Sequence, residues 1–400
     1  MRRSVLAWSL YDLANTAYSA LIVTTFFPVL ITKYLGGTAF HVGLAMSGSL
    51  LMAGLLVPFF GGISDVTRVK KPFIIAFTLI TVTLTLLIAY SNLLWASIFM
   101  LLANLFYHAS IDIYDSYLPL IAKQSEYGRV SGMGTAFGYL GTVLSVGMAL
   151  LIIYVFGDSS LGTIRILFIA SAAFFLINSI YPFFVLRDPV RRNVSFKNAA
   201  KTSIKEITDT LTNVRKYKYL WFFLIASLLY VDGLNTVIVF LFLFGQSEFG
   251  LTLVNFLPLL AIMGVTAFLG SLIFGKLTDI IGPKHTLITA LILWITMIIA
   301  LILDTSMFTY ILSGLLGGAL LGGIWTATRP MLIELAPKHK IAELFGFQGL
   351  TEKFGAAIGP AIFGYLAVTY NYDVALGSVL LFFIAGLALL VQVKLPSHTA

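Results

Sequence analysis

The chain has 400 residues, of which 59% are hydrophobic and only 10% charged, and its mean hydropathy is +0.97. A soluble domain carries about 25% charged residues, so this composition excludes a water-soluble globular protein. The absence of cysteine excludes disulfides, thiolate metal sites and cysteine nucleophiles.

Apolar stretches of about twenty residues or more recur along the whole chain. Each is long enough to cross the roughly 30 Å hydrocarbon layer as a helix, and a helix satisfies its own backbone hydrogen bonds in lipid. We therefore predict an all-α membrane protein with twelve transmembrane helices. The expected spans are 6–33, 42–63, 72–91, 93–117, 130–156, 164–186, 219–244, 251–274, 284–303, 307–332, 342–369 and 374–393.

Basic residues gather on one side of the predicted spans. With the N-terminus inside, 21 of the 25 Lys and Arg residues fall on the inner side, and only Lys33 and Arg165 fall outside. The positive-inside rule then predicts a multi-pass protein of the cell (plasma) membrane with both termini cytoplasmic. The net charge of +8 thus indicates topology and contact with anionic membrane lipid, not a nucleic-acid partner.

The long polar segment 187–218 divides the chain into six spans and six. We predict an N-terminal six-helix bundle over 1–186, a cytoplasmic linker over 187–218 and a C-terminal six-helix bundle over 219–400. The second part of the linker has the pattern of a basic amphipathic helix on the membrane surface. A plain tether between the two halves is the simpler interpretation.

An internal repeat relates the two halves. The string GGISDVTRVKK at 61–71 returns as GKLTDIIGPKH at 275–285, at an offset of 214 that also pairs Gly132 with Gly346. The opening motif D-x-x-N-T, from Asp12 to Thr16, returns from Asp232 to Thr236. Because both copies of G-x-x-x-D follow an even-numbered span, the halves have the same orientation, as in transporters that rock two bundles. The signature-loop residues are Gly61, Asp65, Arg68 and Lys70 in the first copy and Gly275, Asp279 and Lys284 in the second.

The signature loops, the twelve spans and the repeat of six spans resemble the major facilitator superfamily. The glycine of each loop permits close helix approach, and the aspartate can accept from a neighbouring helix N-terminus or a basic side chain. Such contacts would latch the cytoplasmic side shut in one conformation.

Longer strings narrow this resemblance. YDLANTAYS at 11–19, YDSYLPLIA at 114–122, YVDGLNT at 230–236 and the region 322–366 resemble the autophagy-related vacuole-effluxer branch and its prokaryotic relatives. The resemblance implies a twelve-span transporter, and in eukaryotes that branch is linked to amino-acid efflux from the vacuole. This chain lacks the long insertions of the eukaryotic branch.

Charged side chains inside the spans are the main functional candidates, because burying them in lipid is costly. They are Asp12, His108, Asp112, Asp115, Asp232, Arg329, Glu352 and Lys353. Apart from the last two, all lie in spans 1, 4, 7 and 10, which line the central cavity in the fold that the resemblance implies. Glu352 can reach such a cavity or belong to a surface pair.

Asp115 and Arg329 occupy repeat-equivalent positions with opposite charges. We hypothesise that Arg329 pairs with Asp115, Asp12 or both when the cytoplasmic side is closed. The alternative is a static ion pair. Removing one partner of a buried pair would cost several kcal/mol, on the order of 3–5.

Asp232 lies near the middle of span 7 and is the candidate for a carboxylate that is protonated or binds a substrate amine. Asn235 follows it by one turn, as Asn15 follows Asp12.

His108 and Asp112 share a helix face and can share a proton, with plain packing as the alternative for His108. Tyr11 and Tyr230 flank the aspartates of the two repeats.

These observations predict a secondary active transporter that moves a small polar solute by alternating access, with protons or another ion as coupling partners. Three or four acids and one Arg suit an amino acid, a small peptide or an amine better than a polyanion. No P-loop, H-E-x-x-H or G-x-S-x-G motif indicates an enzyme, and we expect no cofactor, no metal and a monomer. A channel or a non-transporting receptor or scaffold on the same fold is the alternative.

Overall fold

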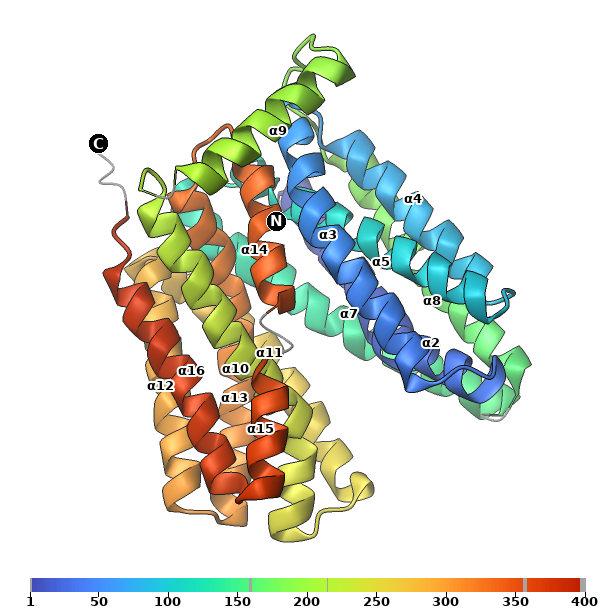
Figure 1. The fold of residues 1–400 in the computed structure, drawn as a ribbon, viewed down its shortest axis with the longest axis vertical. Helices are drawn as coiled ribbons and strands as arrows, with labels where there is room; N and C mark the ends of the chain where they lie inside the picture. The colour runs from blue at the N-terminus through green and yellow to red at the C-terminus, as the bar shows by residue number, and fades with distance from the viewer. Residues whose placement is uncertain (1, 158–159, 214, 355–357, 396–400) are drawn as a thin grey trace. The chain divides into compact units, whose positions relative to one another are not determined.

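The computed structural model describes residues 2–157, 160–213, 215–354 and 358–395, without the side chains of 39, 253–255, 257 and 353. Every regular element in this part of the chain is helical (Figure 1). In chain order the elements are α1 (Arg3–Ala17), η1 (Tyr18–Phe26), α2 (Phe27–Val29), η2 (Leu30–Tyr34), α3 (Ala39–Thr67), α4 (Lys71–Ile88), α5 (Leu93–Asp115), α6 (Leu118–Ile121), η3 (Gln124–Glu126), α7 (Tyr127–Phe156), α8 (Leu161–Val185), α9 (Phe196–Thr212), α10 (Lys218–Phe249), α11 (Leu253–Ile281), α12 (Pro283–Leu303), α13 (Met307–Leu335), α14 (Ile341–Phe354), α15 (Ile358–Thr369) and α16 (Tyr372–Gln392).

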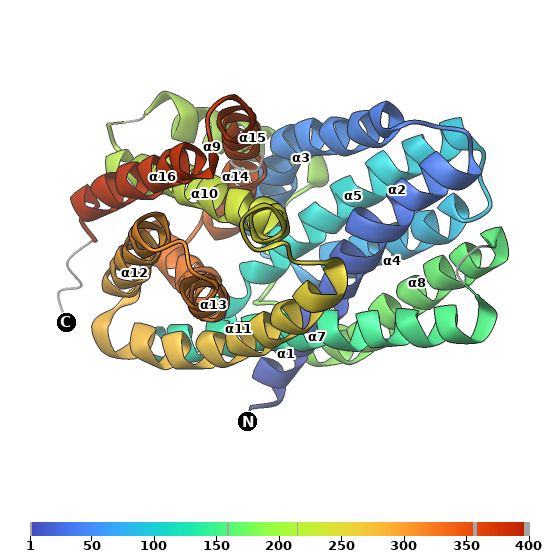
Figure 2. The ribbon, with the colours of Figure 1, turned by 90° about the horizontal axis from the view of Figure 1, so that it is seen from below.

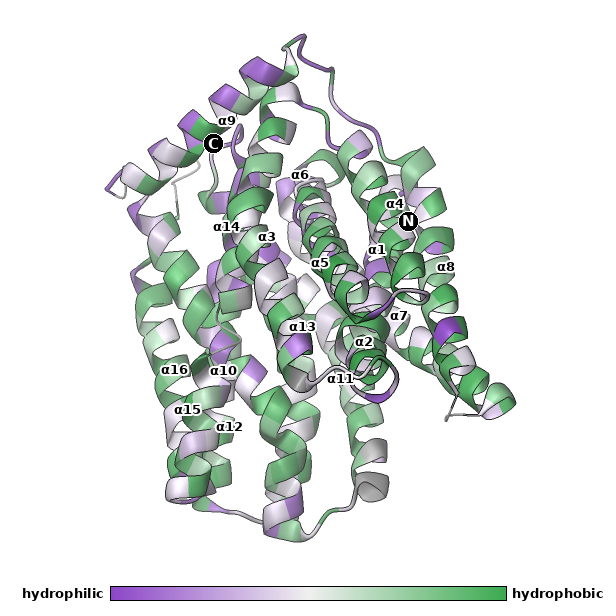
Figure 3. Cartoon of the chain, turned by 45° about the vertical axis from the view of Figure 1, so that its right-hand side comes forward, coloured by the Kyte–Doolittle hydropathy of each residue, from purple (hydrophilic) through white to green (hydrophobic). Residues whose placement is uncertain are grey.

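Within the described residues, eleven helical segments are long and apolar enough to cross a membrane. They correspond to predicted spans 1–10 and 12, and hydrophobic residues cover most of their length (Figure 3). Predicted span 11, 342–369, contains α14 and α15, and residues 355–357 within it lie outside the described residues. The count of twelve therefore stays a prediction.

Several helices continue past the predicted span ends. Spans 2, 7 and 8 were predicted to end near residues 63, 244 and 274, but α3 continues to Thr67, α10 to Phe249 and α11 to Ile281. The G-x-x-x-D strings are therefore helical. In a helix, residues i and i+4 lie on one face. The glycine and the aspartate of each string thus face the same neighbour.

By its internal contacts the chain forms two compact units. Unit 1 comprises 1–122, 137–209 and 339–346, and unit 2 comprises 123–136, 210–338 and 347–400. Three helices divide between them: α7 passes from unit 2 to unit 1 at Phe137, α9 from unit 1 to unit 2 at Thr210, and α14 from unit 1 to unit 2 at Phe347. The division of the chain at 187–218 stays a prediction, because the units exchange segments of α7 and α14.

Helix packing inside each unit follows the repeat. In unit 1, α5 packs against α3 and α4, and α8 packs against α1 and α4. In unit 2, α13 packs against α11 and α12, and α16 packs against α10 and α12, and Figure 2 shows α12 next to α13 and α10 next to α16. These are the same four pairings, each shifted by six predicted spans, so the sequence repeat is also a packing repeat.

Small residues allow the closest of these pairings. Gly318 and Gly322 of α13 lie directly against backbone carbonyls of α11, those of Met263 and Ala267, where a Cβ atom would overlap. Without a hydrophobic driving force between helices in lipid, such close backbone packing is a main source of helix association.

Candidate functional site: the latches and the buried acids

The first latch joins the end of α3 to the start of α14 within unit 1. The Asp65 carboxylate accepts from the backbone N–H groups of Ala342, at 2.7 Å, and Glu343, at 3.1 Å. These are the second and third residues of α14, whose N–H groups have no partner inside the helix. A carboxylate placed there also meets the positive end of the helix dipole.

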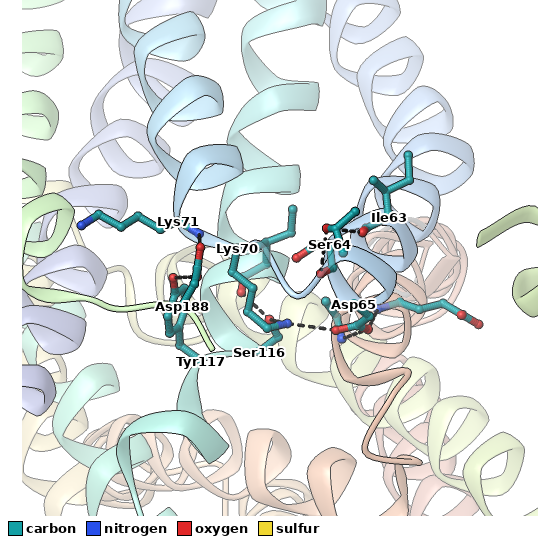
Figure 4. Close-up of polar contacts among 12 residues, drawn as sticks. Ile63, Ser64, Asp65, Lys70, Lys71, Ser116, Tyr117 and Asp188 are labelled. Atoms are coloured by element: carbon teal, nitrogen blue, oxygen red, sulfur yellow. Dashed lines mark hydrogen bonds and ion pairs between the residues drawn. The ribbon is translucent and has the colours of Figure 1, made fainter. Parts of the chain in front are cut away.

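Lys70 neutralises the Asp65 charge from the same loop. Its ammonium lies 2.9 Å from Asp65 Oδ1 and donates to Ser116 Oγ at 2.8 Å, just beyond the end of α5 (Figure 4). Both charged side chains are buried, with 8% of Lys70 and 5% of Asp65 exposed. This part of the first latch is therefore a desolvated ion pair.

The second latch joins the end of α11 to the start of α7 within unit 2. The Asp279 carboxylate accepts from the backbone N–H groups of Gly128, at 2.7 Å, and Arg129, at 3.2 Å. It also accepts from Arg129 Nε at 2.7 Å, and the Arg129 side chain is 60% exposed. The second latch therefore has the same backbone contacts as the first, but its basic partner, Arg129, is exposed to solvent.

The two latches obey the sequence offset. Residues 128 and 129 plus 214 give 342 and 343, the two residues that Asp65 contacts. The glycines follow the same rule: Gly61 packs on the Ala342 backbone and Gly275 on the Gly128 carbonyl. Both aspartates accept from a helix N-terminus and from a basic side chain, whereas the predicted role of these contacts, to hold the cytoplasmic side shut, stays a prediction.

The other basic residues of the signature loops have different environments. Lys284 donates to the carbonyls of Val391, at 2.8 Å, and Val393, at 2.6 Å, at the end of α16. Arg68 follows α3 in the left-handed conformation, with φ of 58°, and so ends that helix. Equivalent sequence positions therefore do not guarantee equivalent ion pairs.

Asp12 and Asn15 lie buried on α1 in unit 1, and Asn15 Nδ2 lies 3.4 Å from Asp12 Oδ1. Thr16 donates to the Gly138 carbonyl of α7 at 2.8 Å, which holds this face of α1 against α7. Asp12 and Asp112 both lie within electrostatic range of the Tyr107 hydroxyl of α5. Two of the predicted acids therefore belong to one polar region of unit 1.

The remaining candidates of α5 lie along the same helix. Asp112 and Asp115 are buried, and His108 is half-buried with its ring edge towards Tyr107. Asp112 and Asp115 therefore place two buried carboxyl groups on one helix inside unit 1.

Tyr11 belongs to an aromatic stack within unit 1. Its ring lies 4.7 Å from that of Tyr114, which stacks on Trp8 at 4.8 Å, and its hydroxyl bonds to Thr78 Oγ1 at 2.7 Å. Tyr11 is fully buried, so these contacts favour a packing role over direct solute contact.

Asp232 of α10 is fully buried in unit 2. Its Oδ1 accepts from the Gly359 N–H at 2.8 Å, and its Oδ2 has no hydrogen-bond partner among the described residues. Asn235 donates to the Val231 carbonyl of its own helix at 3.0 Å, whereas Asn15 points to Asp12. The two copies of D-x-x-N-T therefore use their asparagines differently.

Tyr230, Arg329 and Glu352 all belong to unit 2. The Tyr230 hydroxyl lies 3.2 Å from Thr328 Oγ1, next to Arg329, and it interacts electrostatically with Glu352. Arg329 donates to Thr135 Oγ1 at 3.3 Å, and Glu352 accepts from Gln348 at 2.8 Å. The predicted gate pair stays a prediction, because Arg329 belongs to unit 2 and both Asp12 and Asp115 to unit 1.

Sequence reasoning missed several partners in these contacts. Arg129 and Lys340 counted only as inner-side charges, and Ser116 and Gly359 carried no expectation. Once the structure shows that Asp65 contacts Glu343, the offset of 214 indicates Arg129 as the equivalent contact of Asp279. No comparable signal indicated Ser116 or Gly359.

A membrane-spanning helical repeat with two such latches defines a transporter of the major facilitator superfamily. The family model described as "Vacuole effluxer Atg22 like" matches residues 37–128 and 124–399, so the chain belongs to this family. Proteins of this family and fold are transporters and not enzymes.

Known proteins resemble the chain over nearly its full length. It is 25% identical over 413 residues to the uncharacterized MFS-type transporter YxiO of Bacillus subtilis, covering 98% of this chain and 95% of YxiO. Its fold matches the Escherichia coli fucose:proton symporter FucP with a TM-score of 0.78 at 15% identity over 98% of each chain. It matches the human organic anion transporter MFSD10 with 0.77 at 13% identity over 97% and 99% of the two chains. These structural matches show the fold alone.

Proposed function

We propose that the protein moves a small zwitterionic or cationic solute, such as an amino acid, a small peptide or an amine, across the plasma membrane. Secondary transport itself follows from the family. The observation that carries the solute class is the set of buried acids in the spans, Asp12, Asp112 and Asp115 in unit 1 and Asp232 in unit 2. Within the proposed cavity-lining spans 1, 4, 7 and 10, Arg329 and the terminal Lys33 of span 1 are the only Lys or Arg residues.

Asp232 is the best candidate for the residue that takes up a proton or a substrate ammonium group. A carboxylate oxygen that is fully buried and lacks a hydrogen bond among the described residues is costly when ionised. Protonation or an ammonium ligand removes this cost. Its other oxygen is held by Gly359, which fixes the orientation of the carboxyl group.

The latches supply the conformational part of the proposal. In alternating access the cytoplasmic ends of α7 and α14 are held by Asp279 and Asp65 in one state and released in the other. Asp115 and Arg329 form the cytoplasmic gate pair, with both chain termini on that side. The protein works as a monomer.

Transport by the purified protein in proteoliposomes tests this function. Amino acids, dipeptides and amines that raise its melting temperature are first selected as ligands, because a binder stabilises the native state. Their uptake and efflux are then measured with and without a pH gradient. We expect transport that responds to the gradient and is lost in Asp232→Asn, whereas a receptor or scaffold would bind these ligands without transport.

The gate pair has its own test. Asp115→Arg and Arg329→Asp are expected to block transport singly, and the double variant to restore part of it. Normal transport by both single variants would contradict the gate. A channel would instead show a solute flux whose rate does not depend on the opening and closing of the latches.

A further inference from the structure

The part of the linker that belongs to unit 1, residues 187–209, has its acidic and its basic side chains on different sides. Its acidic residues, Asp188, Glu206 and Asp209, are half-buried, and its basic residues are all exposed. The exposed basic residues are Arg187, Arg191, Arg192, Lys197, Lys201 and Lys205. Six positive charges therefore face outwards while three negative charges are turned towards the unit.

The acids are turned inwards by specific contacts. Asp188 accepts from the Lys71 backbone N–H at 3.0 Å and from the Tyr117 hydroxyl (Figure 4). Asp209 lies 3.4 Å from the ammonium of Lys340, which also donates to the Glu206 carbonyl at 2.8 Å. The carboxylates of Asp188 and Asp209 are thus engaged with the start of α4, with Tyr117 between α5 and α6, and with Lys340 before α14.

Helix α9 presents two different faces. Its inner face carries Ala199 and Ser203, both buried, and Ser203 donates to the Phe59 carbonyl of α3 at 3.0 Å. On another face Phe196 and Ile204 are 67% and 57% exposed, although both are large and apolar.

A lysine stripe runs beside this apolar stripe. Lys197, Lys201 and Lys205 recur every four residues. Each directly follows a residue of the apolar stripe, which consists of Phe196, Ala200 and Ile204. At 100° per residue the two stripes are adjacent and parallel along the helix. Purple, hydrophilic residues are visible along α9 in Figure 3.

We propose that this exposed face of α9 binds the anionic phospholipid surface of the membrane. Apolar side chains beside a row of lysines match the boundary between acyl chains and negative headgroups. Long lysine side chains can reach the headgroups while the apolar side chains enter the boundary. In residues 187–209 the six basic side chains are exposed and the three acidic ones are turned inwards. This positive charge is complementary to an anionic membrane surface, whereas a neutral surface offers no opposite charge.

The bound lipid would also support the first latch. The inner face of α9 holds Lys340 just before α14, the helix whose first N–H groups Asp65 binds. A lipid contact on the exposed face of α9 therefore holds α9 in the position in which it binds Lys340, just before α14.

The test uses the absence of native cysteine. Ile204→Cys is labelled with a polarity-sensitive fluorophore in the full-length protein, reconstituted in vesicles of phosphatidylcholine alone or of phosphatidylcholine with phosphatidylglycerol. We expect emission to shift towards that of an apolar environment in the anionic vesicles. In the K197Q/K201Q/K205Q variant the partitioning of the probe falls about fivefold for each lysine removed.

A matched variant and a salt titration control the result. K276Q/K338Q/K394Q removes the same charge from three exposed lysines outside the linker and should leave the shift unchanged. Raising the ionic strength from about 0.1 M to about 1 M shortens the Debye length from about 10 Å to about 3 Å and should reduce the shift in the labelled protein that keeps all three lysines. This second arm does not depend on the folding of the triple variant.

Three outcomes would overturn the proposal. Equal emission in neutral and anionic vesicles excludes the lipid surface and leaves an acidic protein segment as the occupant. An equal effect of the control variant shows that only total charge matters. A shift produced in neutral vesicles by inorganic phosphate shows an anion site that is not a lipid surface.

Discussion

Replacing Asp65 by asparagine separates the two kinds of contact in the first latch. The amide keeps one acceptor oxygen for α14 but removes the charge that Lys70 needs. Because the Lys70 side chain is only 8% exposed, the variant leaves a buried ammonium without its carboxylate. One-sided breakage of a buried pair costs about 3–5 kcal/mol of unfolding free energy.

Asp279→Asn is the matched control, because it makes the same carboxylate-to-amide change at the residue that binds two backbone N–H groups in the second latch. Its basic partner, Arg129, is 60% exposed and stays solvated after the substitution. An exposed pair contributes about 0–1 kcal/mol. We therefore expect Asp65→Asn to lose roughly 3 kcal/mol more unfolding free energy than Asp279→Asn.

Unfolding in mixed micelles with increasing SDS measures this difference in the purified proteins. The double variant Asp65→Asn, Lys70→Met removes the stranded charge and should recover most of the difference. Ser116 then keeps its own bond to the Ile113 carbonyl, so no new buried donor is left unpaired. Equal losses in the two single variants, or a double variant less stable than Asp65→Asn alone, would refute the desolvation argument.

Three further substitutions test other contacts. Gly132→Ala places a methyl group against the Ser271 carbonyl and should lower the melting temperature by several degrees, whereas Gly147→Ala, in open space on the same helix, should not; equal melting temperatures would contradict the close approach. Lys340→Met removes a buried ammonium that lies 4.0 Å from the fully buried carboxylate of Glu343 and should destabilise the protein by about 3 kcal/mol, against less than about 0.5 kcal/mol for the exposed Lys338→Met, as measured by SDS unfolding. Burial raises the pKa of Glu206 above its usual range, so the folded state binds a proton more readily than the unfolded state and stability falls as pH rises between the two pKa values. Glu206→Gln should flatten this part of the melting-temperature profile against pH and raise stability at neutral pH, and an unchanged profile would speak against it.

The spans and the repeat could be predicted from the sequence because both are local or periodic properties. The length of an apolar stretch determines whether a helix can cross lipid, and this needs no knowledge of its neighbours. The i, i+4 spacing of Gly61 and Asp65 likewise places them on one helix face, whichever helix they contact. The end of α3 was misplaced because the helix continues past the apolar stretch to Arg68, where the backbone turns left-handed.

Partners distant in the chain were decided only by tertiary structure. Nothing local distinguishes Asp65 from Asp279, yet one has a buried lysine and the other an exposed arginine as its partner. The equivalent asparagines, Asn15 and Asn235, likewise have different acceptors although their motifs are the same.

The sequence by itself thus determined the membrane-spanning helical class, the two-fold repeat and the presence of acids within the spans. Only the tertiary structure decided which backbone N–H groups the latch aspartates bind, and that α7 and α14 each divide between the units. The physical reason is that hydrophobicity acts residue by residue, whereas a hydrogen bond or an ion pair depends on an approach within about 3 Å that the packing of distant helices sets.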